Sequence, residues 1–171
     1  FKDLSFPQVK NKILYGGINI INSDVKIINS EISNSNSEDA INIISSKTYI
    51  DNLKMTNIYA DAIDIDFGEV FFSKITCVNI INDCLDVSGV KVKGDYLEAI
   101  NVNDKGLSFG ESSHGIISET NFINNNLGVA VKDGSDLILL NNHSVDNKFD
   151  IAVFNKKNEY GSSKLDLKNI N

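Results

Sequence analysis

Apolar and polar positions alternate along this chain in short stretches that return every 22 residues. The stretch beginning at Asp39 carries apolar side chains at its third and fifth positions, and the same order begins again at residues 61, 83, 105 and 127. These positions form two columns, Ile41, Ile63, Leu85, Leu107 and Val129, and then Ile43, Ile65, Val87, Phe109 and Val131. Alternation with period 2 predicts strands with one buried face, and a fixed longer period predicts stacked repeats.

A column of asparagines keeps nearly the same period. Steps of 23, 23, 22, 22, 23, 23 and 22 residues separate Asn11, Asn34, Asn57, Asn79, Asn101, Asn124, Asn147 and Asn169. Asparagine tolerates left-handed backbone, and its amide both donates and accepts hydrogen bonds. The column therefore predicts an asparagine ladder along one set of turns, as in other stacks of identical polar side chains.

Together these periods predict an all-β fold, a right-handed parallel β-helix of about seven coils of 22–23 residues. Residues 1–171 form one domain on this pattern. The repeat is present by Val9 and still present at Leu167, so we expect a piece of a longer protein. Alternatively, other domains or subunits cap the open β-helix ends, because unpaired strand edges need covering.

Composition narrows the class of partner. Hydrophobic residues make up 42% of the chain, which indicates a globular protein. The net charge of −7 and the absence of a basic patch in the sequence exclude nucleic acid and an anionic membrane surface as expected partners. Cys77 belongs to an inward column and Cys84 follows at the next corner, and we expect both to be buried free thiols.

Stacking of the coils converts polar columns into a surface. The outward columns are Asp39, Asp61, Asp83 and Lys105, then Asn42, Asp64, Asp86 and Ser108, then Ile44, Asp66, Ser88, Gly110 and Lys132. Neighbouring coils lie about 4.8 Å apart, so five carboxylates crowd two successive coils, and like charges at that distance repel. Three interpretations follow: a solvated acidic face, a cation site with calcium on oxygen ligands, or a catalytic acid–base pair.

The order of motifs on successive coils resembles that of the polygalacturonases, right-handed β-helix pectinases with N-T-D, D-D, G-H-G and R-I-K motifs. The resembling segments are 59–61, 82–85, 104–108 and 130–132, and the resemblance covers about residues 57–140. Asn82 replaces the acid that protonates the leaving group, Lys105 replaces the histidine and Ala130 the arginine. An inverting hydrolase needs a proton donor and a base, so the resemblance implies the scaffold and cleft but not pectin hydrolysis.

A second resemblance is to calcium-dependent pectate lyases, which carry a D-D-G-W-D-like segment around the ion. Segment 82–86 is similar, and it implies calcium ligands at Asp61, Asp64, Asn82, Asp83 and Asp86. Such lyases use a lysine or arginine base, which implies catalytic roles for Lys105, Lys132 and Asp83 and substrate contacts from Asp61, Asp64, Asp66, Asp86 and Ser108. A lysine base needs a depressed pKa, whereas neighbouring carboxylates raise it.

The leading hypothesis is therefore a pectin lyase-like β-helix domain that interacts with polysaccharide, located outside the cell or on its surface. If it is an enzyme, we expect a calcium-dependent lyase or epimerase acting on an acidic polysaccharide. The alternatives are a non-catalytic surface or adhesion module and a structural spacer, because a fold by itself does not assign a function.

Overall fold

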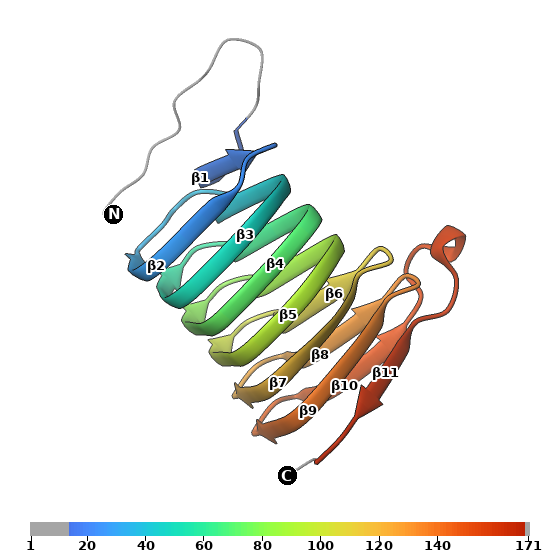
Figure 1. Ribbon diagram of the computed structural model, residues 1–171. Coiled ribbons are helices and arrows are strands. Elements are labelled where there is room, and N and C mark those ends of the chain that lie inside the picture. The colour runs from blue at the N-terminus through green and yellow to red at the C-terminus, as the bar shows by residue number, and fades with distance from the viewer. Residues whose placement is uncertain (1–13, 170–171) are drawn as a thin grey trace.

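Strands form where the apolar columns predict them, and they stack in parallel as a β-solenoid of about six turns (Figure 1). The computed structural model describes residues 14–169, so Asn11 lies outside the described residues. Successive coils pair with an offset of 22 or 23 residues over most of the chain, as the repeat predicts. The fold class is thereby confirmed.

Each coil contributes to two faces of the solenoid. The long strands β3 (Asp39–Ile58), β4 (Asp61–Ile80) and β5 (Leu85–Val102) each run across both faces. The first face consists of β1 (Gly16–Ile21), the beginnings of these three strands, β6 (Lys105–Gly110), β8 (Leu127–Lys132) and β10 (Phe149–Phe154). The second face consists of β2 (Val25–Ser33), the remainders of β3, β4 and β5, and then β7 (His114–Ile123), β9 (Asp136–Val145) and β11 (Lys164–Leu167).

The core lies between these faces. All ten residues of the two predicted apolar columns are fully buried, and each such burial stabilises the fold by about 1.5–3 kcal/mol. The small residues before the first column mark a close approach of adjacent coils. A Cβ placed on Gly106 would lie 2.5 Å from the Phe122 ring and 2.8 Å from the Gly128 carbonyl oxygen. Within residues 14–169 the only helix is the short 3-10 segment η1 (Asn158–Tyr160), and none is long enough to cross a membrane.

The asparagine ladder is present over the central coils. Each side-chain amide donates to the side-chain oxygen one coil earlier: Asn57 to Asn34 (3.3 Å), Asn79 to Asn57 (3.0 Å), Asn101 to Asn79 (3.0 Å) and Asn124 to Asn101 (2.8 Å). All five backbones are left-handed, with φ between 54° and 58°. The ladder therefore combines the two properties that select asparagine at a turn.

The predicted ladder is wrong at its last two members. β7 and β9 pair with an offset of 22 residues, so Asp146, with a φ of 57°, stands beside Asn124. Asn147 instead bonds backbone groups of the preceding coil. The next offset is 28 residues because the loop containing η1 lengthens the last coil. Asn169 consequently donates to Asn141, in a different column, at 3.1 Å.

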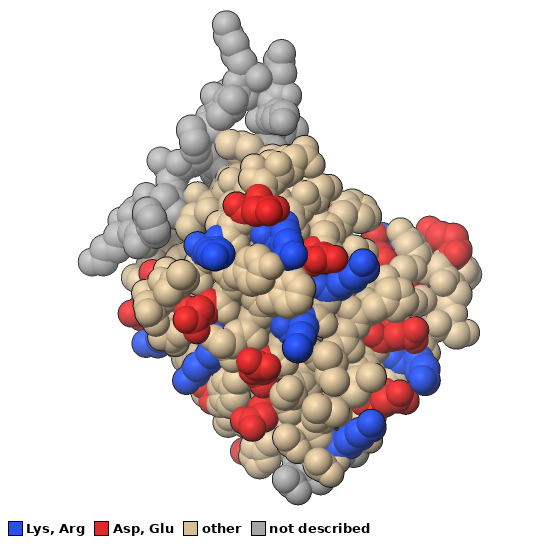
Figure 2. Space-filling view, viewed as in Figure 1, with Lys and Arg blue, Asp and Glu red and all other residues tan. Residues whose placement is uncertain are grey.

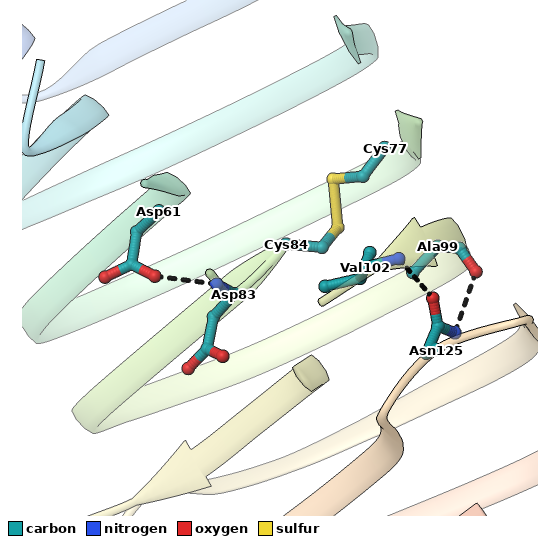
Figure 3. The surroundings of a disulfide bond; sticks show 7 residues. All are labelled: Asp61, Cys77, Asp83, Cys84, Ala99, Val102 and Asn125. Atoms are coloured by element: carbon teal, nitrogen blue, oxygen red, sulfur yellow. Dashed lines mark hydrogen bonds between the residues drawn. A yellow bond between two sulfur atoms is a disulfide. The ribbon is translucent and has the colours of Figure 1, made fainter. Parts of the chain in front are cut away.

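The two cysteines form a disulfide, so the prediction of free thiols is wrong. Cys77 lies within an inward column, between Met55 and Ala99, and Cys84 occupies the small-residue position at the following corner. Their Cα atoms lie 5.8 Å apart. Figure 3 shows the bridge inside the coil, close to the corner that carries Asp83. Both residues are fully buried. Two inward side chains can meet across the interior of the solenoid, and the 22-residue repeat predicts only which side chains are neighbours on successive coils.

Candidate functional site

The predicted polar columns align on the first face. Asp61 pairs with Asp39, and Asp64 stands between Asn42 and Asp86. The same register continues from Asp86 to Ser108 and places Lys132 one coil beyond Gly110. The solenoid thus brings the predicted site residues onto one surface.

Burial on this surface excludes a fully solvated acidic face. Asp39 is 5% exposed, Asp83 is 2% exposed and Ser108 is 0% exposed, while Asp64 and Asp86 are half-buried. Carboxylates at such positions lose hydration, which favours the neutral form. The cluster therefore needs compensation from protons, hydrogen bonds, cations or a ligand.

Asp61 and Asp83 each bind the backbone of the next coil, and Figure 3 shows the bond between Asp61 and the Asp83 backbone. Asp61 Oδ1 accepts the Asp83 N–H at 2.8 Å and the side-chain amide of Asn82 at 2.7 Å. Asp83 Oδ1 accepts the Lys105 N–H at 2.9 Å. These carboxylates hold the corners of three successive coils together, which gives the first polar column a structural role.

Lys105 neutralises this column. Its ammonium nitrogen lies 3.1 Å from Asp83 Oδ1 and 2.5 Å from Asp104 Oδ2, and its side chain is 18% exposed. Burial lowers the pKa of Lys105, but Asp83 and Asp104 outweigh it and raise this pKa above its ordinary value. A lysine base needs the opposite shift, so the structure opposes Lys105 in that role.

The pKa of Asp83 is raised to about 7 by burial, although Lys105 acts to lower it. Burial also raises the pKa of Asp39 to about 6, against the lowering effect of the bond from Asn42. The pKa of Asp64 is the highest of the three: burial, followed by repulsion from Asp66 and Asp39, raises it to about 8. The Asn42 amide donates to Asp39 at 3.0 Å and to Asp64 at 3.3 Å.

Beside Asp64, two buried oxygen atoms lack partners. Within the part of the chain that the structure describes, neither Asp86 Oδ1 nor Ser108 Oγ has a hydrogen-bond partner. The two residues are Cα partners on neighbouring coils. Burial, then Asp86 and Glu111, raise the pKa of Asp66. We call Asp64, Asp66, Asp86 and Ser108 the acidic cluster, since it joins two aspartates of raised pKa to the two unpartnered oxygens.

Glu111 was not among the predicted site residues, although it lies at the edge of the acidic cluster. It sits at a left-handed corner, with a φ of 55°. Lys157 forms an ion pair with Glu111 Oε1, and the Tyr160 hydroxyl lies 3.3 Å from Glu111 Oε2. Asp133 Oδ1 fixes this loop by accepting the Lys157 N–H at 2.6 Å. The loop falls outside the 22-residue repeat, so the repeat could not place it.

Hydrogen bonds within the protein already engage some of the predicted calcium ligands. Residues 14–169 contain no group of three or more His, Cys, Asp or Glu side chains that could hold a metal ion. Asp61 and Asp83 direct oxygens to backbone N–H groups. Among the predicted ligands, the carboxylates of Asp64 and Asp86 accept fewer hydrogen bonds from the protein.

Comparisons of this chain with protein-family models, with curated proteins and with solved structures gave no match.

Proposed function

We propose that this chain is a polysaccharide-binding β-helix domain that contacts its ligand through the acidic cluster. The observation that carries this proposal is the group of half-buried carboxylates of Asp64, Asp66 and Asp86 on neighbouring coils, where Asp86 Oδ1 has no partner among the described residues. A buried polar atom without a partner costs about 1–3 kcal/mol. Sugar hydroxyls donate hydrogen bonds to carboxylates, and the half-buried side chains of Asp64 and Asp86 are ones that a polyhydroxylated ligand can reach.

The solenoid supports an extended ligand in particular. The columns of the first face continue from Asn42 through Asp64 and Asp86 to Ser108, with one polar group per coil. Neighbouring coils are separated by about 4.8 Å. A regular polymer can therefore repeat similar contacts along the axis, whereas a compact small molecule would use only one or two coils.

Calcium is part of the proposal as a bridge between the acidic cluster and the polysaccharide. The donor set suits it, because Asp64, Asp66 and Asp86 supply carboxylate oxygens, which calcium prefers. Burial and then repulsion between carboxylates raise the pKa of Asp64 and of Asp66, and a bound cation would offset the repulsion. Asp61, Asn82 and Asp83 would support the site through the corner hydrogen bonds.

A lyase or epimerase activity is the second candidate. Lys132 favours it, since this lysine forms no ion pair with any residue between 14 and 169, whereas Lys105 forms two. The Lys132 side chain lies against Gly110, one coil from Ser108. In this mechanism Lys132 would remove the proton beside a uronate carboxylate, and Asp83 would act only by holding Lys105.

The buried disulfide supports a location outside the cytosol. Structural disulfides form and persist in oxidising environments and are rare in reducing ones. The Cys77–Cys84 bridge is fully buried and links a residue of β4 to the corner that follows it. We therefore propose an extracellular or cell-surface domain, where polysaccharide is an accessible ligand.

Binding to a panel of neutral and acidic oligosaccharides tests the proposal. Asp64→Asn and Asp86→Asn should each weaken binding about tenfold, since each removes a carboxylate that accepts a hydrogen bond from a sugar hydroxyl. Glu119→Gln is the matched control, because Glu119 is exposed on the second face. Equal affinity of all variants, or an equal loss in the control, would contradict binding at the acidic cluster.

The calcium and catalytic components have separate readouts. Millimolar calcium should raise the melting temperature of the wild type but not that of a variant with Asp64→Asn and Asp86→Asn. Magnesium serves as the ion control. For the lyase, acidic polymers should yield an unsaturated product that absorbs in the ultraviolet, and Lys132→Met should abolish it. Absence of that product across pectate and alginate would reject the lyase, and absence of proton exchange with deuterated water at the uronate carbon would reject the epimerase as well.

A further inference from the structure

A groove lies on the second face, away from the acidic cluster. Its volume is about 670 Å³, within the usual range of ligand sites. Its walls include one aligned column, in which Lys26 pairs with Tyr49, Tyr49 with Phe71 and Phe71 with Lys93. Two aromatic rings are thus bracketed by a lysine on the coil before and a lysine on the coil after.

The rings of this column are held in place. Tyr49 and Phe71 stack with centroids 5.2 Å apart and planes inclined by 15°. Lys47 lies over both rings at 5.5 Å, and Lys26 lies 5.9 Å from the Tyr49 centroid. These contacts order the lysines near the rings without burying their charge, because Lys26 and Lys93 are exposed. The groove is consequently preorganised.

Apolar surface is exposed where the groove opens. Tyr49 is 39% exposed and Ile28, which also lines the groove, is 54% exposed. Phe71 is half-buried beside them. An apolar patch rimmed by charged residues on a folded domain marks an interaction site more often than a patch of chance origin. A ligand here must combine an apolar surface with negative charge.

The lysines at the two ends of the aromatic column point to an anionic ligand. The six lysines between residues 14 and 104 all lie on the second face together with five acidic residues, and Lys26 and Lys93 are not among the lysines that form ion pairs between residues 14 and 169. The aspartates of the acidic cluster all lie on the first face. Figure 2 views the second face and shows lysines distributed over it, with acidic side chains between them. Asp51 and Asp95 line the groove as well, so its cations are spaced rather than continuous.

We propose that the groove binds an anionic glycan chain. Carboxylate or sulfate groups of the glycan would pair with Lys26 and Lys93, and the C–H surfaces of the sugars would contact Tyr49, Phe71 and Ile28. The two lysines stand three coil steps apart, or roughly 14 Å at the spacing of neighbouring strands. This spacing suits negative charges that recur along a polymer of rings. Binding here needs neither calcium nor the acidic cluster.

The test is a titration of the whole chain, with calcium chelated, against an oligouronate, a sulfated oligosaccharide and a neutral oligosaccharide of similar length. We expect saturable binding of one or both anionic glycans and no binding of the neutral one. The carboxylated and sulfated arms identify the charged group. A polyglutamate peptide is the fourth arm, and equal binding of this peptide would overturn the choice of a glycan.

Variants separate the groove from general charge attraction. A variant with Lys26→Gln and Lys93→Gln should bind the anionic glycan about tenfold more weakly. A variant with Lys54→Gln and Lys74→Gln has the same net charge and should bind nearly as the wild type does. An equal loss in both variants would reject the groove as the site.

The aromatic contribution has its own control. Phe71→Ala should also weaken glycan binding, and the melting temperature shows whether this variant remains folded. Tyr49→Phe keeps the stack and should retain binding. Asp86→Asn, which tests the acidic cluster, should leave groove binding unchanged. Loss of binding in Asp86→Asn with the lysine variant unaffected would overturn the groove and keep the proposed function.

Discussion

The carboxylate of Asp83 accepts both the backbone N–H and the ammonium group of Lys105, the residue that follows it one coil further along, at 2.9 and 3.1 Å. Asp83 is almost completely buried, and Lys105 is mostly buried. One side chain thereby joins two coils and one ion pair neutralises a buried charge. The position that the pectinase resemblance assigns to catalysis thus also makes a contact between coils in this chain.

Removal of Lys105 should therefore destabilise the fold in a pH-dependent way. Lys105→Met leaves Asp83 buried without its cation, which should lower the free energy of unfolding by about 2–4 kcal/mol at pH 8. At pH 5 the loss should be smaller, because the raised pKa of Asp83 lets the carboxyl protonate. Urea denaturation at both pH values measures the difference. Lys105→Met combined with Asp83→Asn should recover part of the loss, and no recovery would contradict the ion-pair explanation.

Stability should fall as the pH rises from about 4 to 8. The unfolded-state pKa of these aspartates is near 3.8, whereas the folded protein holds Asp39 at about 6, Asp83 at about 7 and Asp64 at about 8. The folded state thus binds more protons in this window, and linkage requires that it loses stability as those protons leave. Asp64→Asn should remove on the order of 1–2 kcal/mol of this dependence. Melting temperatures across the window provide the measurement, and a curve that rises with pH would contradict the assignment.

Much of the fold follows from the sequence because the repeat is regular where it matters. A period of 22 residues sets which side chains become neighbours, so the core columns and the alignment of Asp64 with Asp86 could be predicted. The prediction failed where the period changes. Asn169 shifted column because the loop before it is longer, and Glu111 gained partners from that same loop.

The roles of the site residues were harder to predict than their positions. The columns predict which residues are adjacent, but they do not predict which hydrogen-bond donor each carboxylate meets. A carboxylate that accepts hydrogen bonds from the backbone of the next coil has a structural role. Asp61 takes a backbone N–H that every coil offers, while Asp86 Oδ1 finds none among the described residues. The disulfide was missed for a similar reason, since Cys77 and Cys84 meet across a coil rather than along a column.

The disulfide should contribute measurably to stability. Cys77 and Cys84 close a loop with a sequence separation of 7, and restricting such a loop in the unfolded chain stabilises the fold by about 2–3 kcal/mol. Replacing both residues with alanine should lower the free energy of unfolding by that amount, seen as a lower midpoint in urea denaturation. Wild type in reductant should approach the same value once the buried bridge opens. Identical midpoints for the wild type and the variant under oxidising conditions would show that the bridge does not form.

The asparagine ladder should be most sensitive at Asn79, which donates to Asn57 and accepts from Asn101. Asn79→Ala removes both side-chain hydrogen bonds. It also places alanine at a φ of 58°, a left-handed backbone that alanine disfavours. We expect a loss of about 1–3 kcal/mol in the free energy of unfolding. Asn79→Gly separates the two causes, because glycine adopts the left-handed backbone freely but has no amide. If Asn79→Gly is nearly as stable as the wild type, the turn geometry alone selects asparagine. If Asn79→Gly loses as much stability as Asn79→Ala, the hydrogen-bonded stack selects asparagine.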